Sequence, residues 1–220
     1  MHAVDLITTD IAALKPTDPV TLALDRMEDA KVGHLPVVEK GRLVGLLKEA
    51  GLSDQLGPKA TVADVMDQVE VPFVRGGQHI YDVMKLLVER ALTVVPVLDM
   101  EGQYIGMVNE HQALRRLAEV TNMREPGSVL VLEMNQNDYS LQEIARIVEG
   151  NDAKVLSVYC HSLPESVRME VTLKINREDI SDVLQTFDRY EYQVKSTFQG
   201  SLLHEDLRGR FDELMRIINQ

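Results

Sequence analysis

An internal repeat of about 60 residues constrains this chain more than any other feature of its sequence. Apolar residues at the helical spacing i, i+3, i+4 and i+7 recur at this offset, in Val20–Met27 and in Ile80–Leu87. The segments Pro36–Val38 and Pro96–Leu98 match at the same offset. A repeat of this length indicates two copies of one supersecondary unit, which pack together because neither copy buries its apolar face alone.

Each copy predicts a helix, a β-hairpin and a second helix. The first helix of the first copy is expected at Val20–Ala30, where apolar residues form one stripe along the helix. Two short β-rich runs around a loop that contains Gly41 predict the hairpin, and a polar, helix-compatible stretch follows it. We expect a short extended lead-in before each copy, at Ala3–Ile7 and at Val62–Met66.

The second half of the chain has a different pattern. Between Val129 and Phe198, apolar runs and helical stripes follow the order strand, helix, strand, strand, helix, strand. The clearest strand is Val167–Ile175, in which apolar and polar residues alternate strictly. This order is that of a ferredoxin-like split β-α-β fold. A final apolar stripe from Leu207 to Ile218 predicts an amphipathic helix that docks on its own subunit, on a partner subunit or on a separate effector.

The first half resembles a tandem pair of cystathionine β-synthase (CBS) domains, also known as a Bateman module. The resemblance lies in His34–Leu47 and Thr93–Val108, which repeat a proline-containing strand, a glycine turn and a second apolar strand. It implies an α+β fold in which the pair consists of two β-α-β-β-α units. The size and element order of the second half resemble an ACT domain, which would add a ferredoxin-like βαββαβ unit.

We therefore expect three parts along the chain. The CBS module is expected at residues 1–122, with its repeats at about 1–57 and 60–122. The ACT-like domain is expected at 129–199 and the C-terminal helix at 201–220. This domain order is similar to that of the acetoin-utilisation accessory proteins of bacteria.

The CBS resemblance implies a ligand cleft between the repeats, where the family binds adenine nucleotides. In the family, a hydroxyl residue follows the hairpin, and an aspartate three positions later accepts hydrogen bonds from both ribose hydroxyls. This chain has Lys48 and Gly51 at these positions in the first copy, and Asn109 and Gln112 in the second. Both carboxylates are missing, and each lost hydrogen bond to a charged group costs about 1.5–3 kcal/mol.

The second copy keeps polar side chains that can serve a ligand. Gln112 can bond a ribose hydroxyl, and Arg116 on the same helical face would approach a phosphate, as Lys48 would in the first copy. The alternative is that Asn109 only caps a helix and that Arg116 is a solvated charge. The resemblance places adenine against the first strand of each hairpin, although the prolines there have an alternative role in shaping the strand entrances. The candidate ligand-binding residues are Leu35, Pro36, Lys48, Val94, Val95, Pro96, Asn109, Gln112 and Arg116.

Charge and motif content argue against several classes of protein. The net charge is −12, whereas nucleic-acid binding needs clustered Lys and Arg. No apolar run approaches membrane-spanning length and no signal peptide is recognisable, so we expect a cytoplasmic protein without a membrane contact. The six histidines lack metal-ligand spacing, and no nucleophile or phosphate-loop motif is present. We therefore expect no enzymatic activity, no catalytic residue and no metal.

Three functions remain open at this point. The first is a sensor whose CBS pair binds AMP, ADP, ATP or another adenosine-containing or phosphorylated ligand and controls a subunit arrangement or an effector protein. The second is an amino-acid-binding regulator that acts through the ACT-like domain, although Asp138 and Tyr139 replace the Pro and Gly of the family's binding loop. The third is a ligand-free scaffold. A homodimer through the CBS or the ACT-like surfaces is expected.

Overall fold

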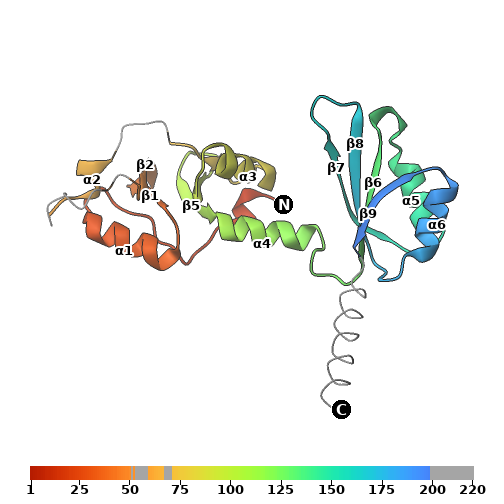
Figure 1. The fold of residues 1–220 in the computed structure, drawn as a ribbon. Helices are drawn as coiled ribbons and strands as arrows, with labels where there is room; N and C mark the ends of the chain where they lie inside the picture. The colour runs from red at the N-terminus through yellow and green to blue at the C-terminus, as the bar shows by residue number, and fades with distance from the viewer. Residues whose placement is uncertain (51, 53–58, 67–70, 199–220) are drawn as a thin grey trace, which may run out of the picture. The chain divides into compact units, whose positions relative to one another are not determined.

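The computed structural model describes residues 1–50, 52, 59–66 and 71–198. The chain divides into two compact units, Met1–Leu117 and Ala118–Gln220, which are described separately below (Figure 1). The predicted C-terminal helix lies outside the described residues.

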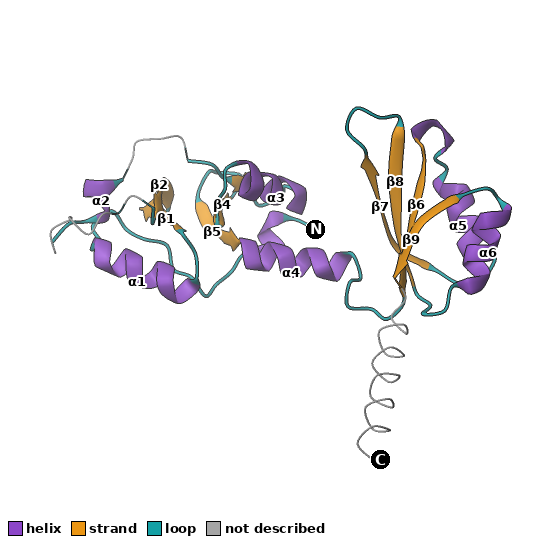
Figure 2. Ribbon diagram, in the orientation of Figure 1, coloured by secondary structure: helices purple, strands orange, loops and turns teal. Residues whose placement is uncertain are grey.

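Two similar copies make up the first unit. The elements are α1 (Val20–Ala30), β1 (His34–Glu39) and β2 (Arg42–Lys48) in the first copy, and β3 (Val74–Arg75), α3 (Ile80–Glu89), β4 (Val94–Leu98), β5 (Tyr104–Asn109) and α4 (Glu110–Val120) in the second. Both predicted hairpins are present and antiparallel (Figure 2), with Lys48 opposite His34 and Asn109 opposite Val94. Lys48 and Asn109 therefore occupy equivalent positions.

The two lead-in segments are helical turns, and the prediction of extended segments was wrong. Ala3–Leu6 forms the 3-10 turn η1, and Val62–Val65 forms the short helix α2. An aspartate near the end of each turn accepts a hydrogen bond from the backbone N–H three residues earlier, at 2.9 Å for both Asp5 and Asp64. This is half of a capping box, which stabilises a first helical turn even where β-branched residues are present.

Each lead-in packs against the other copy. Ala3 and Leu6 are fully buried in the apolar core of the second copy, whereas Val62 is fully buried in the core of the first. The chain after η1 continues along β5, where the backbone N–H of Thr8 donates to the carbonyl oxygen of Met107 at 2.9 Å. The copies thus exchange their first segments, and the residues after η1 come to lie beside the end of the second hairpin.

A buried histidine lies at the junction between the copies. His34 is only 7% exposed, and its Nδ1 lies 3.1 Å from Thr93 Oγ1 and 3.3 Å from the Thr93 backbone nitrogen. Thr93 Oγ1 accepts a hydrogen bond from the Gly33 N–H at 2.9 Å, so its hydroxyl hydrogen is available to Nδ1. Nδ1 is therefore an acceptor and the ring is neutral. Burial lowers the pKa of His34, and the positive charge of Lys48 lowers it further.

Within the described part of the second unit, four antiparallel strands form a sheet in the order β7-β8-β6-β9. Its elements are β6 (Ser128–Asn135), η2 (Gln136–Asp138), α5 (Leu141–Glu149), β7 (Val155–Ser162), β8 (Arg168–Ile175), α6 (Ser181–Arg189) and β9 (Gln193–Phe198). Figure 2 shows both helices on the same side of the sheet, where Ile144, Phe187 and Leu132 share one apolar core. The predicted ferredoxin-like topology is confirmed.

The helix α5 begins with a side-chain cap at Ser140. Ser140 Oγ accepts a hydrogen bond from the Glu143 N–H at 3.3 Å. The Glu143 carboxylate accepts a hydrogen bond from the Tyr192 hydroxyl at 3.0 Å. Burial raises the pKa of Tyr192 to about 12, with the hydrogen bond to Glu143 adding to the shift. The carboxylate therefore ties the start of α5 to the beginning of β9.

The His34 environment predicts a loss of stability in mild acid. An unfolded histidine takes up a proton at a pH of about 6.5, whereas folded His34 resists protonation. The unfolded state then binds more protons in the window below that pH, and the free energy of unfolding falls as the pH drops through it. Urea unfolding at pH 7.5 and 5.5 should show this fall, and His34→Asn should reduce it. The exposed His161, changed to Asn, is the control; an equal reduction in both variants would contradict the assignment.

Two equivalent glycines predict unequal sensitivity to substitution. A Cβ on Gly106 would lie 2.4 Å from Ile7 Cγ2, and one on Gly45 would lie 2.2 Å from Met66 Sδ. Gly106 also has a φ of +150°, which side chains rarely adopt. Gly106→Ala should lower the free energy of unfolding by about 1–3 kcal/mol, and Gly45→Ala by less, because the flexible Met66 side chain can move. Equal losses in urea unfolding would contradict this.

Candidate functional site

A cavity of about 420 Å³ lies in the first unit where the chain after η1, the end of α1 and the end of β5 meet. This volume falls within the range of about 300–1,000 Å³ that is usual for small-molecule sites. The residues lining it are Thr8, Asp10, Ile11, Ala12, Arg26, Asp29, Ala30 and Asn109. Both copies contribute to the lining, because the exchanged lead-in brings Thr8 beside β5.

Asn109 connects this cavity to the start of α4. It is the last residue of β5, and its Oδ1 accepts a hydrogen bond from the Gln112 N–H at 2.7 Å. The predicted capping role is therefore confirmed. The cap uses only Oδ1, so the Nδ2 amide group of Asn109 is available as a donor to a ligand in the cavity.

The charged groups of the cavity come from α1 and from the chain after η1. Arg26 is half-buried, and its Nη1 donates to the Ala13 carbonyl oxygen at 3.1 Å and lies 3.6 Å from Asp18 Oδ2. Asp10 and Asp29 are exposed. Among the described residues that line the cavity, two carboxylates thus accompany one guanidinium, whose charge is already paired outside the lining.

The other predicted binding residues do not line this cavity. Five of them are buried in the first strands of the hairpins, namely Leu35, Pro36, Val94, Val95 and Pro96. Lys48 is exposed at the end of β2, and Gln112 and Arg116 are half-buried on α4. The side chains of Leu35, Val94 and Val95 belong to the apolar cores of the copies. A role in ligand binding stays a prediction for all of them.

Sequence reasoning did not include Asp10, Arg26 or Asp29 in the site. Arg26 and Asp29 are three residues apart and lie together on the polar side of α1, a pattern shared by many solvated helices. Asp10 reaches the cavity only because of the lead-in exchange. The counterpart of this segment in the second copy is the chain after α2. Its residues 67–70 lie outside the described residues.

A second cavity, of about 410 Å³, lies in the second unit near the start of α5. Its lining includes Asp138, one of the two residues that replace the Pro and Gly of the ACT binding loop. Among its described lining residues, four carry carboxylates, namely Glu133, Asp138, Glu143 and Glu191. Glu133 is paired with Arg168 and Lys195. The other three carboxylates are unfavourable for the carboxylate of an amino acid, which weakens the case for an amino-acid site at this loop.

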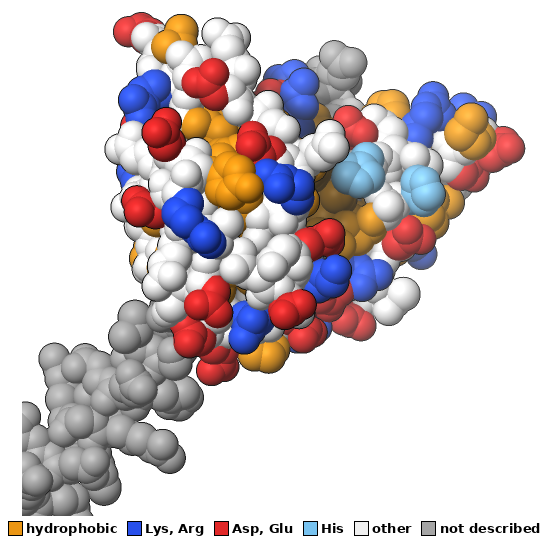
Figure 3. Space-filling view, turned by 90° about the vertical axis from the view of Figure 1, so that its right-hand side faces the viewer, with side chains coloured by type: hydrophobic (Ala, Val, Ile, Leu, Met, Phe, Trp, Pro, Cys, Tyr) orange, Lys and Arg blue, Asp and Glu red, His pale blue; other side chains and the backbone are white. Residues whose placement is uncertain are grey.

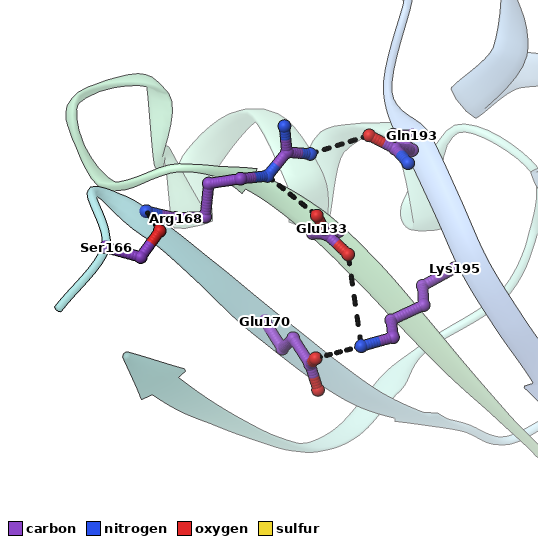
Figure 4. A network of polar contacts seen from close by, with 6 residues as sticks. All are labelled: Glu133, Ser166, Arg168, Glu170, Gln193 and Lys195. Carbon is purple, nitrogen blue, oxygen red and sulfur yellow. Dashed lines mark hydrogen bonds and ion pairs between the residues drawn. The ribbon is translucent and has the colours of Figure 1, made fainter. Parts of the chain in front are cut away.

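The helix-free face of the sheet carries a network of paired charges (Figure 4). Arg168 Nε lies 2.7 Å from Glu133 Oε1, and Lys195 Nζ lies 3.9 Å from Glu133 Oε2. Lys195 also pairs with Glu170, which raises the pKa of Lys195, and Arg168 donates to Gln193 Oε1 at 2.7 Å. The network links β8, β6 and β9, and it makes the part of this face around Glu133 polar.

The described residues show neither a metal cluster nor a membrane-spanning helix. In these parts of the chain, no three His, Cys, Asp or Glu side chains are grouped so that they could hold a metal ion. None of the helices there is long and apolar enough to cross a bilayer. On the face seen in Figure 3, acidic and basic side chains are interspersed.

Comparison with known proteins identifies relatives of several kinds. The magnesium transporter MgtE of Thermus thermophilus is 35% identical over 102 residues, covering 44% of this chain and 22% of the transporter. The CBS domain-containing protein YhcV of Bacillus subtilis is 27% identical over 139 residues, covering 60% of this chain and 95% of YhcV. The chain spans only 22–36% of the length of three longer curated relatives, including MgtE.

Similar solved structures cover about half of this chain. One is a CBS domain pair/ACT domain protein from Thermotoga maritima, with 24% identity and a TM-score of 0.49 over 54% of this chain and 98% of that one. Another is CBSX2 in complex with AMP, with 25% identity and a TM-score of 0.45 over 54% of this chain and 97% of that one. The model of the CBS domain family matches residues 3–55 and 62–119, just over half of the chain. The chain therefore belongs to the CBS-domain family.

Proposed function

We propose that this CBS-domain protein is a regulatory sensor whose CBS pair binds an adenosine-containing ligand, such as an adenine nucleotide, in the cavity beside Asn109. The main observation behind the proposal is that both copies contribute residues to one cavity of about 420 Å³. A ligand there contacts both copies at once. It therefore stabilises the arrangement in which both sets of contacts are made, which is how binding shifts a conformational equilibrium.

The polar groups of the lining are suited to binding a ligand. Asn109 Nδ2 is a donor, the Thr8 hydroxyl can donate or accept, and the carboxylates accept. We propose a regulatory role without enzymatic activity.

The regulated output is proposed to be a subunit arrangement or a partner protein. A homodimer through the CBS surfaces or the ACT-like second unit would convert ligand binding into a change between subunits. The protein is proposed to act in the cytoplasm, without a nucleic-acid or membrane partner. The similarity in domain order to acetoin-utilisation accessory proteins stays an expectation.

Ligand binding should raise the melting temperature of the protein. A ligand at 100 times its dissociation constant stabilises the folded state by about 2.7 kcal/mol, and at roughly 2–4 °C per kcal/mol this raises the melting temperature by about 5–10 °C. A thermal-shift panel should contain adenosine, AMP, ADP, ATP, S-adenosylmethionine, NAD and the amino acids. A shift with amino acids alone would indicate an amino-acid site in the second unit instead. The absence of a shift with every compound would indicate a ligand-free scaffold.

Two substitutions of Asn109 separate its cap from its contact with the ligand. Asn109→Ala removes both, so it should lower stability by about 1 kcal/mol and weaken binding. Asn109→Asp keeps an acceptor for the Gln112 N–H but lacks the Nδ2 donor, so it should weaken binding with little loss of stability. Ser140→Ala is the matched control, because it removes a helix cap in the other unit and should leave ligand affinity unchanged. Unchanged affinity in both Asn109 variants would contradict the placement of the ligand.

A further inference from the structure

The charged residues that line the cavity affect how many phosphate groups a bound adenosine compound can carry. Asp10 and Asp29 lie in the lining, and both are exposed carboxylates. Arg26 is the basic residue among the described lining residues, and its guanidinium is engaged by the Ala13 carbonyl oxygen and by Asp18. Among the described lining residues the carboxylates therefore outnumber the guanidinium by two to one, and that guanidinium is already paired, so the charge of the lining is unfavourable for a phosphate.

The start of α4 does not reverse this balance. A helix N-terminus carries a partial positive charge that attracts anions. In this protein Asn109 Oδ1 already accepts from the Gln112 N–H, and Glu110 places a carboxylate in the first turn of the helix. The positive end of α4 is thus partly compensated by the protein's own groups.

The same carboxylates can accept hydrogen bonds from the ribose of a nucleoside. Ribose hydroxyls are donors, and a carboxylate is the strongest acceptor that a side chain offers to them. Position 112, where the family resemblance calls for an aspartate, carries no carboxylate in this chain. Asp10 and Asp29 bring carboxylates to the cavity from the other copy.

We infer that Asp10 and Asp29 accept the ribose hydroxyls of the ligand and that the cavity discriminates against phosphate. The preferred ligands are adenosine compounds with the least negative charge, and affinity decreases from adenosine through AMP and ADP to ATP. This inference rests on the proposed function, since it assigns the ligand class of the same cavity.

Isothermal titration calorimetry of the full chain tests the order of affinities. The probes are adenosine, AMP, ADP, ATP and S-adenosylmethionine, each without divalent cations, which would otherwise bridge phosphates to carboxylates. At 20 mM salt, affinity should fall by about 2- to 5-fold for each added phosphate, as expected for like charges about 5–8 Å apart with water between them. Positively charged S-adenosylmethionine should bind at least as tightly as adenosine.

The salt dependence gives a second readout that needs no variant. Repulsion between exposed charges is screened by salt, with a Debye length of about 8 Å at 0.15 M. Raising the salt concentration from 20 to 300 mM should therefore strengthen ATP binding and leave adenosine binding nearly unchanged. A phosphate-binding cavity would show the opposite trend, because its attraction for ATP would be screened.

Charge-neutral variants identify the residues responsible. Asp29→Asn and Asp10→Asn each remove one negative charge with little change in shape, so each should improve ATP affinity relative to adenosine and weaken adenosine binding. Glu28→Gln is the matched control, because it removes the same charge from the neighbouring position on α1, which does not line the cavity. It should change the ratio of affinities less than Asp29→Asn.

The outcomes distinguish this inference from the proposed function. Tightest binding of ATP, weakened by salt, would overturn the inference and leave an adenosine-binding sensor in place. An affinity ratio that is the same in Asp10→Asn, Asp29→Asn and wild type would also overturn it. Absence of binding by every adenosine compound would overturn both.

Discussion

The exchange of lead-in segments between the two copies is the interaction on which the first unit depends. Leu6 is fully buried in the core of the second copy, and full burial of such a side chain contributes about 1.5–3 kcal/mol. Val62 makes the reciprocal contribution to the first copy. Because each copy completes its core with a segment that precedes the other copy, neither copy has its full apolar core alone. The backbone bond between Thr8 and Met107 then fixes the chain that forms one wall of the cavity.

Close backbone packing follows from this exchange. Gly45 and Gly106 lie at equivalent positions in the hairpins, and each faces a side chain from a lead-in, Met66 and Ile7 respectively. In any other residue, a Cβ atom would overlap the lead-in side chain at this point. The glycines therefore allow the lead-ins to pack closely against the hairpins. This explains why the repeat preserves glycine at these two positions while neighbouring apolar residues vary in size.

Much of the fold could be predicted from the sequence, whereas most of the cavity could not. The helical stripe of Val20–Ala30 and the alternation of Val167–Ile175 report local burial directly, and both elements are present within one residue of their predicted bounds. The periodicity of the lead-ins does not say which core receives them, because both cores are apolar and alike in composition. Asp10, Arg26 and Asp29 meet Asn109 only through that choice of core. Asn109 was predicted because the CBS resemblance implies a ligand contact at the residue that follows each hairpin, and the repeat locates that residue.

Asn109 both lines the cavity and caps the helix α4, which begins beside it. Its Oδ1 holds the first turn of α4, so the orientation of its Nδ2 is fixed before any ligand arrives. A donor that is already held in place loses little conformational entropy on binding, which favours affinity for a ligand of modest size. A ligand that bound Nδ2 and shifted the Asn109 side chain would also move the acceptor away from the Gln112 N–H, so the proposed contact would make the cap sensitive to the ligand. In the proposed site, occupancy of the cavity and the stability of the first turn of α4 would therefore be coupled through one side chain.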